Sequence, residues 1–173
     1  METVYTKNII EFVTVALEYC AYLEQCESKR FQDFVPVMQK VLSLLYLKAA
    51  IVEKPVPLGD MDVPQSVTEA DYNAIEKKVA DLMGEYDSYF DGDEASSVSE
   101  NLADIYQELK DFIMNYKKGD QAVSNDSLYS CLDTFENYWG VRLLNCVKAL
   151  HNIAYSIKPD DDDIQGDDNQ GGN

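Results

Sequence analysis

The hydrophobic residues of this chain recur with the period of an α-helix along most of its length. At about 100° per residue, the apolar side chains of residues 6–27 share one arc of a helix, and Glu11 and Glu18 lie on the opposite side. The same test indicates four further helices, over residues 29–53, 68–84, 97–118 and 124–157. No stretch alternates as a β-strand does. The pattern therefore predicts an all-α fold, an irregular bundle of about five helices whose second and fifth members are the most buried.

Capping residues indicate where several of these helices begin. Thr6 is placed as the N-cap of the first helix. Thr68 with Asp71 predicts a capping box for the third helix, and Ser97 with Glu100 predicts one for the fourth. In each box the hydroxyl and the carboxylate satisfy backbone N–H groups that the helix itself leaves without partners.

Three stretches have the composition of connections. Residues 54–67 contain three prolines and predict a long crossover, of the kind that lies over a surface groove. Residues 85–95 are acidic and predict a flexible linker. Residues 158–173 are rich in Asp and Gly and predict a disordered acidic C-terminal tail. We therefore expect a single helical domain over residues 1–157.

The net charge of the chain limits the class of partner that it can bind. Its 173 residues include 32 Asp and Glu against 14 Lys and Arg, a formal net charge of −18. Because 46% of the residues are apolar and 11% are aromatic, the chain has the material for a folded core, unlike a disordered acidic protein. A protein with this charge repels polyanions, which argues against direct binding of nucleic acid.

The sequence shows no pattern of export or membrane insertion. Its N-terminal residues lack the basic start and unbroken apolar core of a secretory signal. The longest apolar run, residues 37–52, contains Lys40 and Lys48 and is too short to span a bilayer. We expect a cytoplasmic protein with reduced thiols that act as small apolar side chains, at Cys20, Cys26, Cys131 and Cys146.

Four carboxylates recur along the fourth predicted helix: Glu100, Asp104, Glu108 and Asp111. They fall within about 80° of one another and away from the apolar arc of the same helix, which predicts a solvated face. The same stripe could bind a partner or attract cations. A di-iron site is excluded, because such bundles need Glu-x-x-His pairs and the chain has none. We therefore predict no metal site.

The stripe belongs to a longer acidic region. Residues 81–109 contain nine acidic side chains and no Lys or Arg. Three of them, Asp87, Asp91 and Asp93, lack the ligand order of an EF-hand, which argues against a dedicated calcium site. Aromatic side chains lie within and beside this region, at Tyr72, Tyr86, Tyr89 and Phe90. Exposed acid mixed with aromatic rings predicts a docking surface for a basic partner.

Arg142 falls inside the apolar arc of the fifth predicted helix. A buried guanidinium needs a partner, and Glu24, inside the apolar arc of the first helix, is the natural candidate for an ion pair. Two other interpretations stay open at this point. The side chain could reach the rim of the core, or it could anchor an anion or carboxylate pocket framed by Tyr138 and Trp139.

Motifs for catalysis are lacking. His151 is the one histidine, and no Gly-x-Ser-x-Gly, Walker or Gly-x-Gly-x-x-Gly pattern accompanies it. We predict that the protein is not an enzyme and carries no cofactor.

Several segments resemble an uncharacterised bacterial helical family, domain-of-unknown-function family 5063. The similar segments span most of residues 4–155 and are Val4 to Asn8, Ile10 to Val13, Leu44 to Ala49, Ser99 to Gln107, Tyr138 to Gly140 and Ala149 to His151. The resemblance implies an intracellular all-helical domain and lends no activity.

The leading functional hypothesis is an interaction or adaptor module. In this hypothesis an acidic, Tyr-bearing surface binds a protein partner with a basic surface, such as a nucleic-acid-processing enzyme. The alternative is a helical bundle that binds a small ligand at Arg142. The oligomeric state is left open by the sequence.

Overall fold

The protein is described here by a computed structural model that covers residues 4–59 and 62–156. Its α-helices are α1 (Lys7–Glu24), α2 (Phe31–Ile51), α3 (Glu69–Met83), α4 (Val98–Tyr116), α5 (Gln121–Thr134) and α6 (Gly140–Ser156). A π-helical turn, Phe135–Trp139, joins α5 to α6 without a break. The predicted all-α class and the five helical stretches are therefore confirmed, with the fifth divided into α5 and α6. The predicted acidic tail, residues 158–173, lies outside the described residues.

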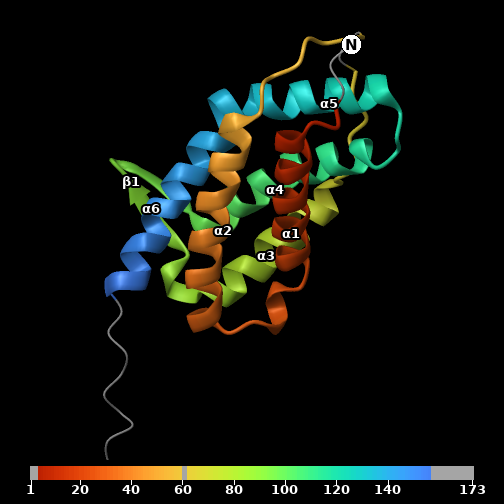
Figure 1. The fold of residues 1–173 in the computed structure, drawn as a ribbon. Coiled ribbons are helices and arrows are strands. Elements are labelled where there is room, and N and C mark those ends of the chain that lie inside the picture. The colour runs from red at the N-terminus through yellow and green to blue at the C-terminus, as the bar shows by residue number, and fades with distance from the viewer. Residues whose placement is uncertain (1–3, 60–61, 157–173) are drawn as a thin grey trace, which may run out of the picture.

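The helices form two layers, and one further helix covers an end of the bundle (Figure 1). Helices α1, α2 and α6 lie side by side nearest the viewer, α3 and α4 lie behind them, and α5 crosses the upper end of the bundle. Two short 3₁₀ turns, Cys26–Ser28 and Gly84–Tyr86, follow α1 and α3. The position of α6 is therefore set by α5, which leads into its start, and by α2, which packs along its side.

Helix α4 is the centre of the core. It packs against α1, α3, α5 and α6, and it buries residues on most of its circumference. Phe112 of α4 stacks on Phe12 of α1 at a centroid distance of 5.7 Å, and Phe12 stacks on Trp139 at 6.5 Å. These rings are almost fully buried, which removes a large apolar area from water. The prediction that the second and fifth helices are the most buried was therefore wrong, because α4 is the most buried helix.

The reason for this error is visible on α2 and α4. Helix α4 buries polar side chains, including Asn101, Asp104 and Asn115, which a count of apolar residues overlooks. Helix α2 instead leaves part of its apolar surface exposed, with Leu44 at 44% and Leu47 at 55%. Apolar content alone therefore gave the wrong order of burial.

The helix starts follow the capping residues. Thr68 and Asp71 form the complete capping box of α3, and the Ser97 hydroxyl accepts a hydrogen bond from the Glu100 N–H at 3.2 Å. The Thr6 hydroxyl accepts one from the Ile9 N–H at 3.4 Å. The fifth helical stretch begins earlier than predicted, because the Asp120 carboxylate caps α5 by accepting from the Val123 N–H at 3.0 Å.

The π-turn bends the fifth stretch so that α5 crosses the bundle and α6 descends along it (Figure 1). The buried Trp139 indole donates a hydrogen bond to the Cys131 carbonyl at 2.8 Å and so bridges the turn. Gly140 closes it. A Cβ atom at Gly140 would lie 2.3 Å from the Phe135 carbonyl oxygen, so a larger residue does not fit there.

The predicted linker is partly a β-hairpin, which corrects both the linker and the expected lack of strands. Strands β1 (Ser88–Asp91) and β2 (Glu94–Ser97) pair antiparallel, with Asp91 opposite Glu94. The two turn residues are therefore Gly92 and Asp93. Gly92 has a φ of 61°, which the favoured two-residue hairpin turns require and which glycine adopts without strain.

Carboxylates hold the crossover between α2 and α3 onto the bundle. Asp126 of α5 accepts hydrogen bonds from the Leu58 and Gly59 N–H groups, at 2.7 and 2.8 Å. Asp111 of α4 accepts from the Ser66 and Val67 N–H groups, at 2.6 and 2.8 Å. Burial alone would raise the pKa of Asp126, but these backbone donors and the Asn125 amide lower it below its usual value.

The longest apolar run was predicted to be too short to span a bilayer, but α2, the helix that contains most of it, is longer than that run. With 21 residues and a mean hydropathy of 1.4, it is the one helix of the described chain that is long and apolar enough to cross a membrane. Of the most apolar 18 residues of this helix, 33% are buried inside the protein. The buried side chains include Phe34, Met38 and Leu42, so the inner face of α2 belongs to the core.

Candidate functional site

The four carboxylates of the predicted stripe do not form one solvated face. Glu100 is exposed as predicted, but Asp104 is only 7% exposed, and Glu108 and Asp111 are half-buried. Helix α3 packs along α4 on one side and α5 packs on another, so the arc that seemed polar is covered. The predicted exposure was therefore wrong for Asp104. In the part of the chain that the structure describes, no group of His, Cys, Asp and Glu has the arrangement of a metal site.

Each of the covered carboxylates has a structural partner. Glu108 accepts a hydrogen bond from the Thr134 hydroxyl at 2.7 Å, and Asp111 holds the crossover. Burial raises the pKa of Glu108, the Thr134 hydroxyl opposes this effect, and the charges of Asp111 and Asp104 raise the pKa further. These contacts join α4 to α5 and to the crossover, so they fix the fold.

Asp104 forms a cluster with three residues, Tyr72, Tyr138 and Arg142. The Tyr72 hydroxyl donates to Asp104 Oδ1 at 2.9 Å, and Arg142 Nε lies 3.1 Å from Asp104 Oδ2. The Arg142 guanidinium also lies over the Tyr138 ring, 4.9 Å from its centroid. Burial raises the pKa of both tyrosines, and the Asp104 carboxylate raises it further. The phenols therefore stay neutral and available as donors.

Arg142 is thus ion-paired, but not with the predicted partner. Glu24 instead accepts hydrogen bonds from the Tyr106 hydroxyl, at 2.9 Å, and from Lys110. Burial would raise the pKa of Glu24, but the Lys110 and Tyr106 hydrogen bonds lower it. Glu24 ends α1 at the lower end of the bundle, whereas Arg142 opens α6 at the upper end (Figure 1). The predicted ion pair between Glu24 and Arg142 was wrong because the angle of a residue on its own helix does not determine its position along the axis of the bundle.

The residues of the predicted pocket, Tyr138, Trp139 and Arg142, line none of the four clefts described below. Trp139 is fully buried in the core, and Tyr138 is 37% exposed beneath Arg142. Four clefts in the described part of the chain have other linings. None of them includes Arg142.

The hairpin and the turn before it carry an exposed acidic surface with two aromatic rings. We call this the hairpin surface, and it consists of Glu85, Tyr86, Phe90, Asp91, Asp93 and Glu94. Phe90 is 75% exposed and Tyr86 is 40% exposed. All six residues belong to the stretch 79–109, which contains no Lys or Arg. The third predicted aromatic residue, Tyr89, is half-buried against the core.

The hairpin is anchored from both sides. The Asp87 carboxylate accepts hydrogen bonds from the Ser99 N–H at 2.8 Å and from its hydroxyl at 2.6 Å. Asn101 donates its side-chain amide to the Tyr89 hydroxyl. Asp87 thus binds the first turn of α4. The predicted flexible linker is instead an ordered element that leads into α4.

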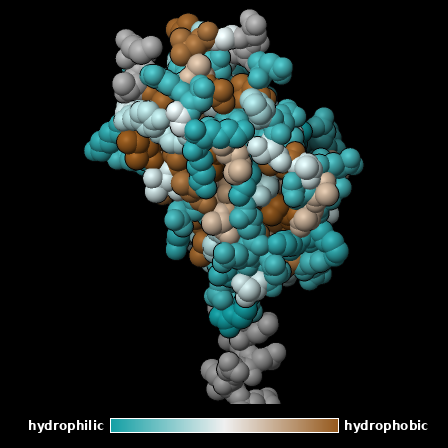
Figure 2. All heavy atoms as spheres, turned by 90° about the vertical axis from the view of Figure 1, so that its right-hand side faces the viewer, coloured by the Kyte–Doolittle hydropathy of each residue, from teal (hydrophilic) through white to brown (hydrophobic). Residues whose placement is uncertain are grey.

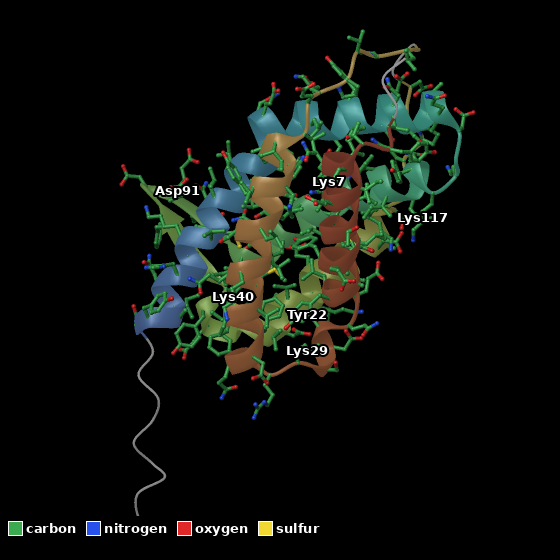
Figure 3. All side chains as sticks on the ribbon, viewed as in Figure 1. Lys7, Tyr22, Lys29, Lys40, Asp91 and Lys117 are labelled. Carbon is green, nitrogen blue, oxygen red and sulfur yellow. The ribbon has the colours of Figure 1, made fainter. Side chains whose placement is uncertain are left out.

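Two further contacts bind the hairpin surface to the helices of the front layer. The Asn145 side chain of α6 donates to Asp91 Oδ2 at 2.9 Å. Tyr86 stacks on Phe31 of α2 at a centroid distance of 5.1 Å. Figure 3 shows Asp91 on the hairpin, beyond α6. Asp91 and Tyr86 of this surface are therefore held in place before any partner arrives.

A cleft of about 200 Å³ lies between the hairpin and α6. The hairpin wall presents Tyr86, Tyr89 and Phe90, and the opposite wall comes from α6. The lining also includes two acidic residues, Glu85 and Asp91, and one basic residue, Lys148. Aromatic and charged residues therefore line the same cleft, which suits a side chain that combines an apolar stem with a charged or amide end.

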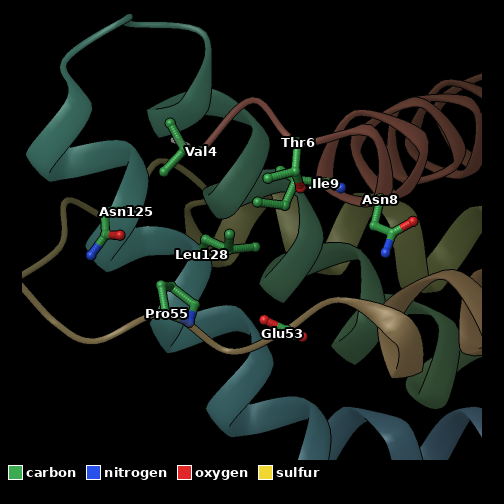
Figure 4. A pocket seen from close by; sticks show the side chains of 8 residues that line it. All are labelled: Val4, Thr6, Asn8, Ile9, Glu53, Pro55, Asn125 and Leu128. Carbon is green, nitrogen blue, oxygen red and sulfur yellow. Dashed lines mark hydrogen bonds between the residues drawn. The ribbon is translucent and has the colours of Figure 1, made fainter. Parts of the chain in front are cut away.

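A second cleft, of about 290 Å³, lies where the crossover approaches the start of α1 (Figure 4). Half of its eight lining residues are apolar: Val4, Ile9, Pro55 and Leu128. The Asn125 side chain on its border donates to the Val56 carbonyl at 2.8 Å, which ties it to the crossover. The predicted groove beside the crossover is therefore present, and two of its polar side chains, Thr6 and Asn125, make hydrogen bonds that stabilise the fold.

The remaining candidates from the sequence are the four cysteines and His151. All four cysteines are buried and free, and burial raises the pKa of each thiol. His151 is exposed on α6, where its ring packs on Tyr155 at 4.7 Å. The right-hand side of the molecule, seen in Figure 2, is mainly hydrophilic with small separate hydrophobic areas.

Comparison with known proteins gives a family without a function. The model of the family described as Domain of unknown function (DUF5063) matches residues 3–156. The crystal structure of protein BF1032 from Bacteroides fragilis is similar, with 42% sequence identity and a TM-score of 0.86. The alignment covers 91% of this chain and 98% of that one. A comparison with curated proteins found no match.

Proposed function

Because the chain belongs to the DUF5063 family, which brings no activity with it, we propose its function from the geometry of the hairpin. In this proposal the protein is a non-catalytic interaction module of the cytoplasm that binds a protein partner with a basic surface. The hairpin surface is the contact region. The observation that carries the proposal is an exposed Phe90 on an ordered hairpin that is surrounded by carboxylates.

Charge supports a basic partner. Glu85, Asp91, Asp93 and Glu94 are exposed on one hairpin and the turn before it, and the formal net charge of the chain is −18. A field of this sign speeds encounter with a basic surface and disfavours nucleic acid, whose phosphates carry the same sign. The partner of this module is therefore a protein with exposed Lys or Arg side chains.

The aromatic rings supply the contact area that charge alone lacks. Exposed acid pairs are worth little when they stay solvated, whereas aromatic side chains are enriched among residues that dominate binding energy. Phe90 is available for burial against a partner, and Tyr86 borders the cleft beside it. An Arg or Lys side chain can lay its stem on these rings and place its charge against Glu85 or Asp91.

The hydrogen bonds around Asp87, Tyr89 and Asp91 support the same role. Side chains that are fixed before binding lose less conformational entropy on association. The binding region is thus moved from the α4 stripe, where Asp104 is buried, to the hairpin at the start of α4. Glu100 is the one member of the stripe that stays exposed beside it.

The direct test is affinity capture from native cells with the full-length protein and a charge-reversed variant. The variant is Asp93→Lys with Glu94→Lys, which reverses two exposed charges at the hairpin tip. The matched control is Glu18→Lys with Glu53→Lys, which makes the same change in charge on α1 and after α2. Captured partners are identified by mass spectrometry, with elution in increasing salt.

We expect a partner with a basic surface that the wild type and the control retain and that the hairpin variant loses. Its retention should fall as salt rises, because screening weakens exposed charge pairs. Equal capture by all three proteins, or a partner that binds better in high salt, would contradict the assignment of the hairpin surface.

A further inference from the structure

The backbone hydrogen bond at the base of the hairpin determines which groups of its strands point outward. The Val98 N–H donates to the Asp87 carbonyl at 2.9 Å, so these two residues form a hydrogen-bonded pair. Hydrogen-bonded and non-hydrogen-bonded pairs alternate along an antiparallel ladder. Ser88 and Phe90 of β1 therefore belong to the non-hydrogen-bonded pairs. Their backbone N–H and C=O groups point away from β2.

The outer edge of β1 has no backbone partner in the protein. Among the described residues, the backbone groups of Ser88 and Phe90 form no hydrogen bond with a loop, a turn or a helix end. A row of such groups on an edge strand is a template for pairing with another strand. The outer edge of β2 has groups of the same kind, at Ala95 and Ser97. The two edges differ in what lies beside them.

The edge of β1 borders the cleft of about 200 Å³ between the hairpin and α6. All four residues of β1 line this cleft, whereas none of the four clefts of the described chain is lined by a residue of β2. The opposite wall is α6, which includes Ala149 and Ile153. Extended peptides add to exposed sheet edges in several classes of domain, where main-chain hydrogen bonds supply affinity and pockets beside the strand supply specificity.

We propose that the cleft between β1 and α6 binds an extended segment of the partner protein, which adds to β1 as a third strand. The outward N–H and C=O groups of Ser88 and Phe90 form hydrogen bonds with the backbone of this segment. The inference rests on the proposed function, because it names the form in which the basic partner meets the hairpin surface. The partner is thus recognised through a short linear stretch of its chain.

Charge selects a basic segment over a second copy of this chain. Glu85 and Asp91 line the cleft, and Asp93 and Glu94 are exposed at the tip of the hairpin. Lys or Arg side chains of the segment are attracted to these carboxylates. Edge-to-edge pairing of two copies would instead bring the carboxylates of both hairpins together, and each chain has a formal net charge of −18.

The two faces of the added strand meet different surroundings, because side chains alternate along a strand. Tyr89 and Asp91 share the face that is turned to the helices, since Asn145 of α6 donates to Asp91. Side chains of the segment on this face meet the wall of α6, which favours apolar residues. Those on the other face lie beside the exposed Phe90 ring, on which a Lys or Arg stem can pack. The segment therefore alternates apolar with basic residues.

Selection from a displayed library of random linear peptides, about eight residues long, tests this inference with the full-length protein. The affinity of an enriched peptide is then measured by fluorescence anisotropy for three variants. Phe90→Pro removes the outward N–H and the ring, and Phe90→Ala removes the ring alone. Ala95→Pro, the matched control, removes the outward N–H of the opposite edge. Neither N–H takes part in the β1–β2 ladder, and proline is tolerated at such edge positions.

Amide hydrogen exchange of the wild type, measured by NMR with and without the peptide, reports on Ser88 and Phe90 without any substitution. We expect the exchange of both N–H groups to slow when the peptide binds. Phe90→Pro should bind the peptide at least about tenfold more weakly than Phe90→Ala, because a carbonyl of the peptide loses its donor. Ala95→Pro should bind as the wild type does. The enriched peptides should alternate apolar residues with Lys or Arg.

A library that yields no binder overturns the strand addition. So do peptides that bind Phe90→Pro and Phe90→Ala equally and leave the exchange of Ser88 and Phe90 unchanged. If affinity capture nevertheless finds a basic partner that depends on Asp93 and Glu94, the hairpin binds a folded surface and the proposed function stands. Conversely, peptides that protect Ser88 and Phe90 support the strand addition even if native cells yield no basic partner, and only the proposed function then fails.

Discussion

Arg142 Nε lies 3.1 Å from Asp104 Oδ2, and this ion pair joins the start of α6 to the middle of α4. The Asp104 side chain is 9% exposed and the Arg142 side chain is 37% exposed, so the acid lies beneath the base. Tyr72 satisfies the other carboxylate oxygen, whereas Oδ2 accepts no hydrogen bond with good geometry among the described residues. The positive charge of Arg142 is therefore the main compensation for a buried carboxylate.

Arg142→Ala should destabilise the fold, because it leaves the buried Asp104 carboxylate with Tyr72 alone. Since Arg142 is partly exposed, we expect a loss of about 1–2 kcal/mol and not the larger penalty of a fully buried pair. The thermal midpoint should fall by about 3–6 °C in calorimetry. Lys148→Ala is the control on the same helix, because Lys148 has no carboxylate within ion-pair distance among the described residues. An unchanged midpoint for Arg142→Ala would contradict the role of the pair.

Glu108→Gln should stabilise the protein at neutral pH. Burial raises the pKa of Glu108 above its usual 4.5, and a glutamine keeps an oxygen that accepts from Thr134. A raised carboxyl pKa means that the contribution of this group is complete below its usual pKa and is lost as pH rises through the raised value. The gain of the variant should therefore be absent near pH 4 and reach up to about 1 kcal/mol at pH 7.

Urea unfolding at several pH values measures this difference. Glu100→Gln on the same helix is the control, because Glu100 is exposed and has no cover from α5. A gain that is independent of pH, or equal in the two variants, would be evidence against burial of the Glu108 charge.

Gly140→Ala should be destabilising although the residue lies in a helix with a φ of −65°. In a helix interior alanine is normally favoured over glycine by about 1 kcal/mol. Here its Cβ would meet the Phe135 carbonyl oxygen at 2.3 Å, so the π-turn must open or shift. We expect a net loss of about 1–3 kcal/mol in chemical unfolding. A stabilised variant would show that the π-turn is not required.

The four cysteines should be unreactive in the folded protein. All four are buried, and burial raises the pKa of each, so the reactive thiolate is scarce. An aromatic disulfide reagent at about pH 8 should label none of them within minutes and all of them in concentrated guanidinium chloride. Rapid labelling of the native protein would identify a thiol that opens to solvent.

The fold could largely be predicted because its signals are local. The capping box of Thr68 and Asp71 forms within four residues, and the apolar period of a helix does not depend on its neighbours. The hairpin was missed for a local reason as well. Its strands show too little alternation to be recognised, although Gly92 and Asp93 formed a turn signal that could have been used.

The candidate site was less predictable, because it depends on which elements pack together. The angle of Asp104 on its helix was consistent with exposure until α3 and α6 covered it with Tyr72 and Arg142. Likewise, Glu24 and Arg142 both lie in apolar arcs, but at opposite ends of the bundle. The periodicity of a single helix predicts the direction of a side chain but not the residue that it contacts. The acid-aromatic composition around Tyr86 and Phe90 needed no such information, and it is the part of the functional hypothesis that carries over to the hairpin.

Site-specific photo-crosslinking in native cells tests the central claim, that the hairpin surface binds a basic protein. A photoreactive phenylalanine derivative is placed at Phe90 in one protein and at Tyr155 in another, because both residues are 75% exposed aromatics. We predict a discrete adduct with a basic protein from position 90 that is lost with Asp93→Lys and Glu94→Lys and is not formed from position 155. Adducts of the same kind and yield from both positions, or an adduct from position 90 that survives the charge reversal, would contradict the account.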